Sequence, residues 1–151
     1  MRQAWRYLQT ALGIIFRHPL TGTSIIPVLP DGKIALIRRR DNGMLSLPGG
    51  MVNWGEDLPT SLKRELKEET GLDLLNLGRL VGVYSSPERD PRFHSICLVV
   101  EVRASGALKT LDKLEVLEVQ AFEPTAIPLN NLSHDHGQQL KDYFSGGTTV
   151  A

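Results

Sequence analysis

The sequence predicts an α/β domain in which a mixed β-sheet lies between helices. Short runs typical of strands are interleaved with three amphipathic stretches typical of helices. The turn Asp31-Gly32, a favoured hairpin dipeptide, separates the first two predicted strands. The 151 residues suffice for one domain with its own core, and the contents of hydrophobic residues (41%) and charged residues (23%) are ordinary for a globular protein.

The chain opens with a predicted amphipathic helix. Apolar residues recur at helical spacing through residues 5–16, and Pro19 ends the pattern. We expect this helix to pack on the domain or to pair with a second copy, which would give a homodimer. The alternative is a helix lying at a membrane surface, because the segment contains arginines and no acid. No apolar run reaches the length of a transmembrane helix, so we expect no stable membrane insertion.

A β-hairpin and a short strand follow this helix. Residues 23–30 and 33–40 form the predicted hairpin, and residues 44–47 form the third strand, which Pro48 and two glycines end. Side chains alternate along a strand, so Arg39 points to the face opposite Arg38 and Arg40. Only part of this arginine run can face one site, and Arg39 is its candidate substrate contact.

A second helix is predicted over residues 59–70. Thr60 or Ser61 is the candidate N-cap, and Gly71 lies where a helix end favours a residue that accepts positive φ.

The second half of the chain alternates strands with turns and ends in a helix. Three more strands are predicted, at residues 80–86, 93–102 and 118–122. A C-terminal helix is expected over residues 133–144, with Ser133 as its cap. We therefore divide the chain into a helix at 1–19, one domain at 20–146 and a flexible tail at 147–151.

Three glutamates of the helix predicted at 59–70 share one face. At about 100° per residue, Glu65, Glu68 and Glu69 fall on the same side. A solvated, salt-bridged surface would explain part of this pattern, since Arg64 precedes Glu68 by four residues. It does not explain why three acids gather behind a glycine-rich turn. A divalent cation such as Mg²⁺, which prefers oxygen ligands, would offset their repulsion and be completed by a phosphate-bearing ligand.

The charge balance and the single cysteine limit the partners and the compartment. The formal net charge is zero, so we expect no nucleic-acid partner. Residues 1–40 carry seven lysines and arginines against one acid, and the remaining 111 residues carry ten against sixteen. Cys97 has no disulfide partner in the chain, which favours a reducing, cytoplasmic location.

The stretch from Gly50 to Leu72 resembles the signature of Nudix hydrolases. That signature reads Gly, five residues, Glu, seven residues, then Arg-Glu-apolar-any-Glu-Glu-any-Gly-apolar. Every fixed position is matched, by Gly50, Glu56, Arg64, Glu65, Leu66, Glu68, Glu69, Gly71 and Leu72. The signature covers 23 residues, and similar segments on both sides extend the resemblance over most of residues 22–145.

The resemblance implies a Nudix-type α/β/α sandwich and an enzyme that hydrolyses a nucleoside diphosphate linked to another moiety. It implies that Glu65, Glu68 and Glu69 hold Mg²⁺ or Mn²⁺ and that the Gly50 carbonyl adds a ligand. Arg64 is expected to hold these carboxylates in place, together with Glu56.

The residue that accepts the proton of the attacking water stays open at this point. Glu68 and Glu69 are candidates within the signature, although a metal ligand is a compromised base. Some family members take the base from a later loop, where this chain offers Glu115 and Glu118. We include Glu118 among the candidate catalytic residues.

The segment "SSPERDPRFHS" resembles the loop of ADP-ribose pyrophosphatases. Pro87, sixteen residues past Gly71, stands where that subgroup has a marker proline, and Arg89 and Arg92 could clamp phosphate or ribose oxygens. The alternative is a rigid turn set by prolines. We favour ADP-ribose, cleaved to AMP and ribose 5-phosphate. The alternatives are a dinucleoside polyphosphate, a nucleoside triphosphate, or a non-catalytic sensor of an ADP-ribose-like ligand.

Overall fold

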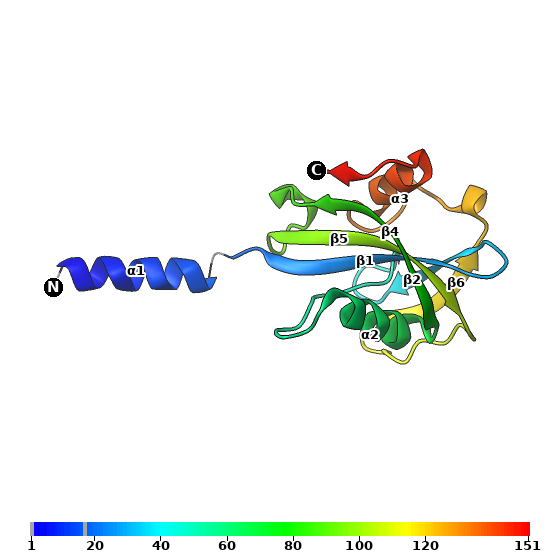
Figure 1. The fold of residues 1–151 in the computed structure, drawn as a ribbon, viewed down its shortest axis with the longest axis horizontal. Helices are drawn as coiled ribbons and strands as arrows, with labels where there is room; N and C mark the ends of the chain where they lie inside the picture. Colours follow the sequence, from blue (N-terminus) through cyan, green and yellow to red (C-terminus); the bar gives the residue numbers. More distant parts are fainter. Residues whose placement is uncertain (1, 17) are drawn as a thin grey trace.

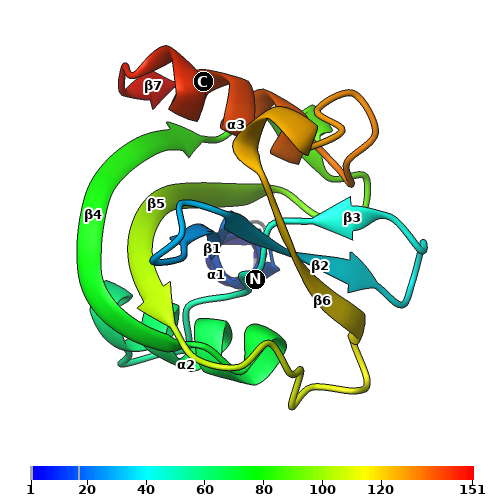
Figure 2. The same ribbon diagram turned by 90° about the vertical axis from the view of Figure 1, so that its right-hand side faces the viewer.

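A mixed sheet lies between two helices in the computed structural model, which describes residues 2–16 and 18–151 (Figures 1 and 2). The helices are α1 (Arg2–Phe16), α2 (Leu58–Thr70) and α3 (His136–Ser145), with short 3-10 turns η1 (Pro87–Arg89) and η2 (Pro124–Ala126). The strands are β1 (Leu20–Val28), β2 (Ile34–Arg39), β3 (Leu45–Ser46), β4 (Asp73–Tyr84), β5 (Ser95–Ser105), β6 (Val116–Phe122) and β7 (Thr149–Val150).

The strand order confirms the predicted mixed sheet. It runs β3-β2-β1-β5-β4-β7, and β6 pairs with β2. The predicted hairpin is present as antiparallel β1 and β2, whereas β1 and β5 run parallel from Leu20↔Ser95 to Val28↔Arg103. In Figure 2, α2 and α3 lie on opposite sides of the curved sheet. The α/β/α sandwich is therefore confirmed.

Two apolar clusters hold the layers together, one on each face of the sheet. Neighbouring residues of β1 point to opposite faces. Ile25 packs in the cluster that contains Leu62 and Leu66 of α2, and Ile26 in the cluster that contains Leu140 of α3. Full burial of each such side chain contributes about 1.5–3 kcal/mol. The leucines at helical spacing thus fix α2 on one face of the sheet.

The N-cap of α2 differs from the prediction. Asp57 caps the helix, because its carboxylate accepts a hydrogen bond of 2.9 Å from the backbone N–H of Thr60. Thr60 and Ser61 lie inside the helix, so both were the wrong choice. Pro59 explains the earlier start, since proline suits the first turn, where backbone N–H groups lack partners. The predicted C-terminus is confirmed by Gly71, with φ of 77°.

The predicted cap of α3 is also wrong. The helix begins at His136, and Asp135 precedes it without a capping hydrogen bond. Ser133 lies further upstream, where its hydroxyl accepts a hydrogen bond of 2.9 Å from the amide of Asn42. Asp135 is instead the partner of Arg89, at 2.6 Å.

Both ends of the chain differ from what the sequence predicts. The tail expected at 147–151 contains β7, which pairs in parallel with β4, and the N–H of Ala151 donates to the Val83 carbonyl at 2.9 Å. At the other end, the predicted amphipathic helix is present as α1. It projects away from the domain instead of packing on it (Figure 1). No helix in the described ranges is long and apolar enough to cross a membrane.

The loop over residues 106–115 is fastened to the last turn of α2. The N–H of Lys109 donates to the Thr70 carbonyl at 2.9 Å, and those of Leu111 and Asp112 donate to the Glu68 carbonyl at 2.8 and 2.9 Å. The last carbonyls of a helix have no partner within it, so this loop satisfies them. Gly71 makes the approach possible, because a Cβ at that position would collide with the Lys109 carbonyl.

The Gly71→Ala variant should therefore lose more stability than a matched glycine variant. We expect a fall of about 2–4 kcal/mol in the free energy of unfolding, from the positive φ and the collision with the loop. Gly146→Ala is the control, because Gly146 ends α3 with φ of 83° and faces open space. Its loss should be about 1–2 kcal/mol. Urea unfolding of both variants measures the difference, and equal losses would show that the loop does not press on Gly71.

Candidate active site

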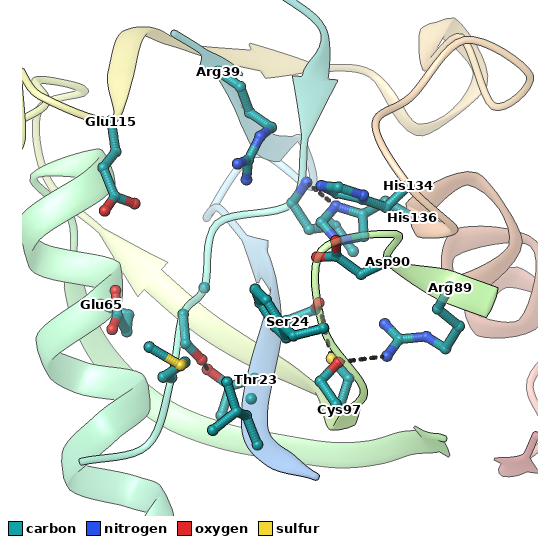
Figure 3. A pocket seen from close by; sticks show the side chains of 18 of the residues that line it. Thr23, Ser24, Arg39, Glu65, Arg89, Asp90, Cys97, Glu115, His134 and His136 are labelled. Carbon is teal, nitrogen blue, oxygen red and sulfur yellow. Dashed lines mark hydrogen bonds between the residues drawn. The ribbon is translucent and has the colours of Figure 1, made fainter. Parts of the chain in front are cut away.

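A cleft of about 450 Å³ lies between α2, the start of β1 and the loops around residues 87–94 and 106–115. Figure 3 shows Glu65 and Glu115 on one side of this cleft and Arg89 and Asp90 on the other, with Arg39 reaching between them. The cleft therefore has an acidic side and a side that carries arginines.

The turn at residues 48–50 packs tightly against β1 and α2. The N–H of Gly49 donates to the Glu69 carboxylate at 2.7 Å. The Gly50 carbonyl accepts hydrogen bonds from the N–H and the hydroxyl of Thr23, at 2.8 and 3.3 Å. Both lone pairs are thus used within the fold, and the geometry does not support the ligand role predicted for this carbonyl. Gly50 instead leaves room for Glu65, whose Oε1 would lie 2.6 Å from a Cβ at that position.

The three glutamates of the signature occupy different environments. Glu69 is 4% exposed, and burial raises its pKa to about 8, against the opposing effect of the Gly49 N–H. Burial also raises the pKa of Glu65, which lines the cleft. Glu68 lines the cleft with an exposed side chain. The helix face predicted from the sequence is therefore graded from buried to exposed.

Arg64 holds the carboxylates of this region together, as the sequence predicts. Its guanidinium donates two hydrogen bonds to Glu56, at 2.8 and 2.9 Å, and one to Glu65 at 2.6 Å. It also approaches Glu68 at 3.4 Å. These contacts lower the pKa of Glu56 to about 2 and raise that of Arg64. Arg64 is thus a positioning residue that orients the acidic side of the cleft.

The donor set fits a hard divalent cation. Across residues 2–16 and 18–151, no three His, Cys, Asp or Glu side chains are already gathered as ligands. The reason is local, since Glu69 turns to Gly49 and Glu65 turns to Arg64. The signature glutamates and Glu115 all offer carboxylate oxygens as ligands. Burial raises the pKa of Glu65, and repulsion from Glu68 and Glu115 raises it further. Unbalanced negative charge on oxygen ligands is what Mg²⁺ or Mn²⁺ would relieve.

Glu115, and not Glu118, reaches the cleft. Glu115 lines it, and its backbone carbonyl accepts a hydrogen bond of 2.9 Å from the N–H of Arg40. Glu118 pairs with Arg38 at 2.7 Å and is not among the residues that line the cleft. The structure therefore does not bring the predicted catalytic residue Glu118 to the site.

The pairing of β2 with β6 is irregular next to Arg39. Arg38 pairs with Glu118 and Arg39 with Val116, so the extra residue, Leu117, lies in β6. The alternation of side chains along β2 is therefore unbroken at Arg39. The Arg39 guanidinium binds Asp41 through two hydrogen bonds of 2.9 and 2.7 Å. Arg39 lines the cleft, and its contact with substrate stays a prediction.

Arg89 lines the cleft, but its donors are used inside the fold. Its guanidinium donates to both oxygens of Asp135, at 2.6 and 3.0 Å, and to the Tyr84 carbonyl and the Ser95 hydroxyl. These contacts favour the alternative that this loop is a rigid turn. Pro87, the predicted marker, begins η1, is exposed and does not line the cleft.

Arg92 is the more available arginine of the same loop. It lines the cleft with a half-exposed side chain. Its Nε and Nη2 donate to Asp90, at 2.9 and 2.7 Å, and Nη1 lies 3.8 Å from Asp41. The guanidinium lowers the pKa of Asp90 to about 2. A phosphate could reach the exposed part of this guanidinium, of whose two partners Asp41 is 49% exposed and Asp90 12%.

Sequence reasoning missed three residues that shape the cleft. Asp90, Asp135 and Asp41 each pair with an arginine predicted to bind substrate. For Asp41 and Asp90 the only signal was an acid next to arginines, in "RRRD" and "ERDPR", and Asp135 had no such neighbour. His136 is buried, burial lowers its pKa to about 3, and it accepts a hydrogen bond from the Leu47 N–H at 3.0 Å. It is thus a neutral packing residue.

Comparison with known proteins agrees with this geometry. The model of the NUDIX domain matches residues 18–143. An ADP-ribose pyrophosphatase from Methanocaldococcus jannaschii is 40% identical over 135 residues, which cover 86% of this chain and 76% of that protein.

Solved structures share the fold. A MutT NUDIX hydrolase from Burkholderia pseudomallei is 26% identical with a TM-score of 0.71, covering 83% of this chain and 98% of that one. The NUDIX domain of Shewanella oneidensis NrtR, complexed with ADP ribose, has a TM-score of 0.76 at 20% identity, covering 88% and 91%. With Gly50, Arg64, Glu65 and Glu68 of its signature lining one cleft and the domain match spanning most of its length, the chain belongs to the Nudix hydrolase family and is a pyrophosphohydrolase.

Proposed function

We propose that this enzyme hydrolyses ADP-ribose to AMP and ribose 5-phosphate with the help of Mg²⁺ or Mn²⁺. The observation that carries the proposal is the cleft itself, which is lined both by Glu65, Glu68 and Glu115 and by Arg39 and Arg92. A pyrophosphate with its cation fits between such sides, because the cation needs carboxylates and the phosphate oxygens need arginines. The 40% identity to an ADP-ribose pyrophosphatase supports the choice of substrate.

In this proposal, Glu65, Glu68 and Glu69 hold the cation. The cation, when bound, neutralises charge on the phosphates and lowers the pKa of the attacking water. Arg64 keeps Glu65 and Glu68 in place, through contacts of 2.6 and 3.4 Å. Glu69 is buried, does not line the cleft in this structure, and anchors the turn at Gly49.

Glu115 is the residue we propose as the general base. Its side chain lies on the same side of the cleft as Glu65, on a loop that hydrogen bonds fix to α2 and β2. A base outside the proposed ligand set keeps its lone pairs free for the proton of the attacking water.

Arg39 and Arg92 are the residues we propose to bind the phosphates. Each is paired with an aspartate in the structure, Arg39 with the exposed Asp41 and Arg92 with the mostly buried Asp90, so substrate binding exchanges one anion for another. The net charge is zero, so no overall electrostatic field attracts nucleic acid to the protein. We propose a small nucleotide as the partner. The single, buried cysteine agrees with work in a reducing compartment such as the cytoplasm.

The substrate is tested by incubating the enzyme with ADP-ribose, a diadenosine polyphosphate and a nucleoside triphosphate, each with Mg²⁺ or with a chelator. We expect AMP and ribose 5-phosphate from ADP-ribose, and no product with the chelator. Faster turnover of either other compound would replace ADP-ribose as the substrate. Binding of ADP-ribose without any turnover would favour a sensor.

The general base is tested by comparing Glu115→Gln with Glu118→Gln. Glu115→Gln should lower kcat by about 10²–10⁴-fold, because the proton of the water loses its acceptor. Glu118→Gln is the matched control, since Glu118 is an exposed glutamate that pairs with Arg38 outside the cleft. Its kcat should stay near wild type. Equal rates for the two variants would remove Glu115 from the chemistry.

The two loop arginines should behave differently. Arg92→Ala should raise KM for ADP-ribose by about tenfold, as one charge-assisted phosphate contact is lost. Arg89→Ala should instead lower the free energy of unfolding by about 3 kcal/mol, because it leaves Asp135 unpaired in a largely buried place. Steady-state kinetics and urea unfolding separate these effects. A stable Arg89→Ala variant with a raised KM would restore Arg89 as a substrate clamp.

A further inference from the structure

Helix α1 carries an apolar face that the domain does not cover. It projects from the domain in Figure 1, and Trp5, Leu8 and Leu12 are 60%, 49% and 43% exposed. A lone helix of about 15 residues is marginal in water, because most helical stability in proteins comes from packing of the apolar face. The amphipathic pattern therefore indicates that another surface covers this face.

The width of the face indicates what kind of surface that is. At about 100° per residue, the apolar side chains span about half of the helix circumference. Within residues 3–14 they are Ala4, Trp5, Tyr7, Leu8, Ala11, Leu12 and Ile14. The opposite arc is polar and contains Gln3, Arg6, Gln9 and Thr10. A two-helix coiled coil covers only a narrow seam of two positions in seven, whereas a bilayer surface covers half of a helix lying in it.

The charge of the segment also favours a lipid surface. The first acidic residue of the chain is Asp31, so residues 1–30 contain no negative charge. Arg2, Arg6 and Arg17 make the segment cationic, which would repel a second copy and attract anionic lipid headgroups. Tryptophan and tyrosine, present at positions 5 and 7, are the side chains that favour the membrane interface.

We propose that α1 lies in the surface of an anionic lipid bilayer and holds the hydrolase domain there reversibly. The apolar arc would rest below the headgroups, and Arg6 would face their phosphates. At about 1.5 Å per residue the helix is too short to span the bilayer, so it binds in the plane of the surface. Because Leu20 begins β1 and also lines the cleft, the cleft would work close to the membrane.

The test is co-sedimentation of the full chain with vesicles. Vesicles of equal parts phosphatidylcholine and phosphatidylglycerol should carry the protein down at low salt, and pure phosphatidylcholine should not. Glu in place of both Leu8 and Leu12 should lower the bound fraction by roughly tenfold or more. The matched control places Glu at Leu75 and Leu77, which are 54% and 47% exposed on β4, and should bind as wild type does. Circular dichroism checks that each variant is folded.

Three results would overturn the proposal. They are absence of co-sedimentation with the anionic vesicles, equal binding to pure phosphatidylcholine, and full binding by the Leu8→Glu, Leu12→Glu variant. Light scattering in the absence of vesicles identifies the alternative occupant. A dimer that this variant dissociates, with no binding of wild type to vesicles, would assign the face to a second copy.

Discussion

The last turn of α2 is the constraint on which the acidic side of the cleft depends. Glu68 contributes its carboxylate to the cleft and its backbone carbonyl to the loop that carries Glu115. The same turn ends at Gly71, where the missing side chain lets that loop approach. Helix geometry thus sets the spacing of the signature glutamates. The backbone carbonyls at the end of α2 hold the loop that carries Glu115, and so set its distance from these glutamates. The last turn of α2 therefore positions both the proposed cation ligands and the loop that carries the proposed general base.

The fold places more negative charge in this region than its own cations balance. Arg64 serves Glu56, Glu65 and Glu68 at once, and Glu69 has only the Gly49 N–H. Burial and mutual repulsion raise the pKa of Glu65 and Glu69 as a result. Such an arrangement lowers the stability of the fold, because desolvated carboxylates of like charge repel one another. A bound divalent cation would relieve this repulsion, and the relief would contribute to its binding free energy.

Much of the fold could be predicted because it depends on local patterns. The hairpin at Asp31-Gly32, the helix that ends at Gly71 and the spacing of the signature all depend on residues close in sequence. Arg39 lines the cleft, in agreement with the strand alternation that separates it from Arg38 and Arg40. The ends of helices were harder to predict. Both Asp57 and Thr60 are suitable N-cap residues, and Pro59 favours the earlier start because proline suits the first turn of a helix.

The rest of the site depends on contacts that a sequence does not display. Arg89 finds Asp135, 46 residues away, so a predicted clamp is held inside the fold. Glu115 and Glu118 lie on the same segment, and only Glu115, which precedes β6, lines the cleft. Because Glu115 lies outside the strand, the periodicity of a strand could not choose between these two candidate bases.

The most direct test of the cation site is calorimetric titration of Mn²⁺ into metal-free protein, for wild type and Glu69→Gln. The wild-type protein should bind Mn²⁺ and release protons near neutral pH, because a carboxyl group with a pKa of about 8 must ionise to bind a cation. Glu69→Gln should bind at least about tenfold more weakly and release fewer protons. Equal affinity and equal proton release in the two proteins would show that the buried glutamate of α2 does not serve a metal.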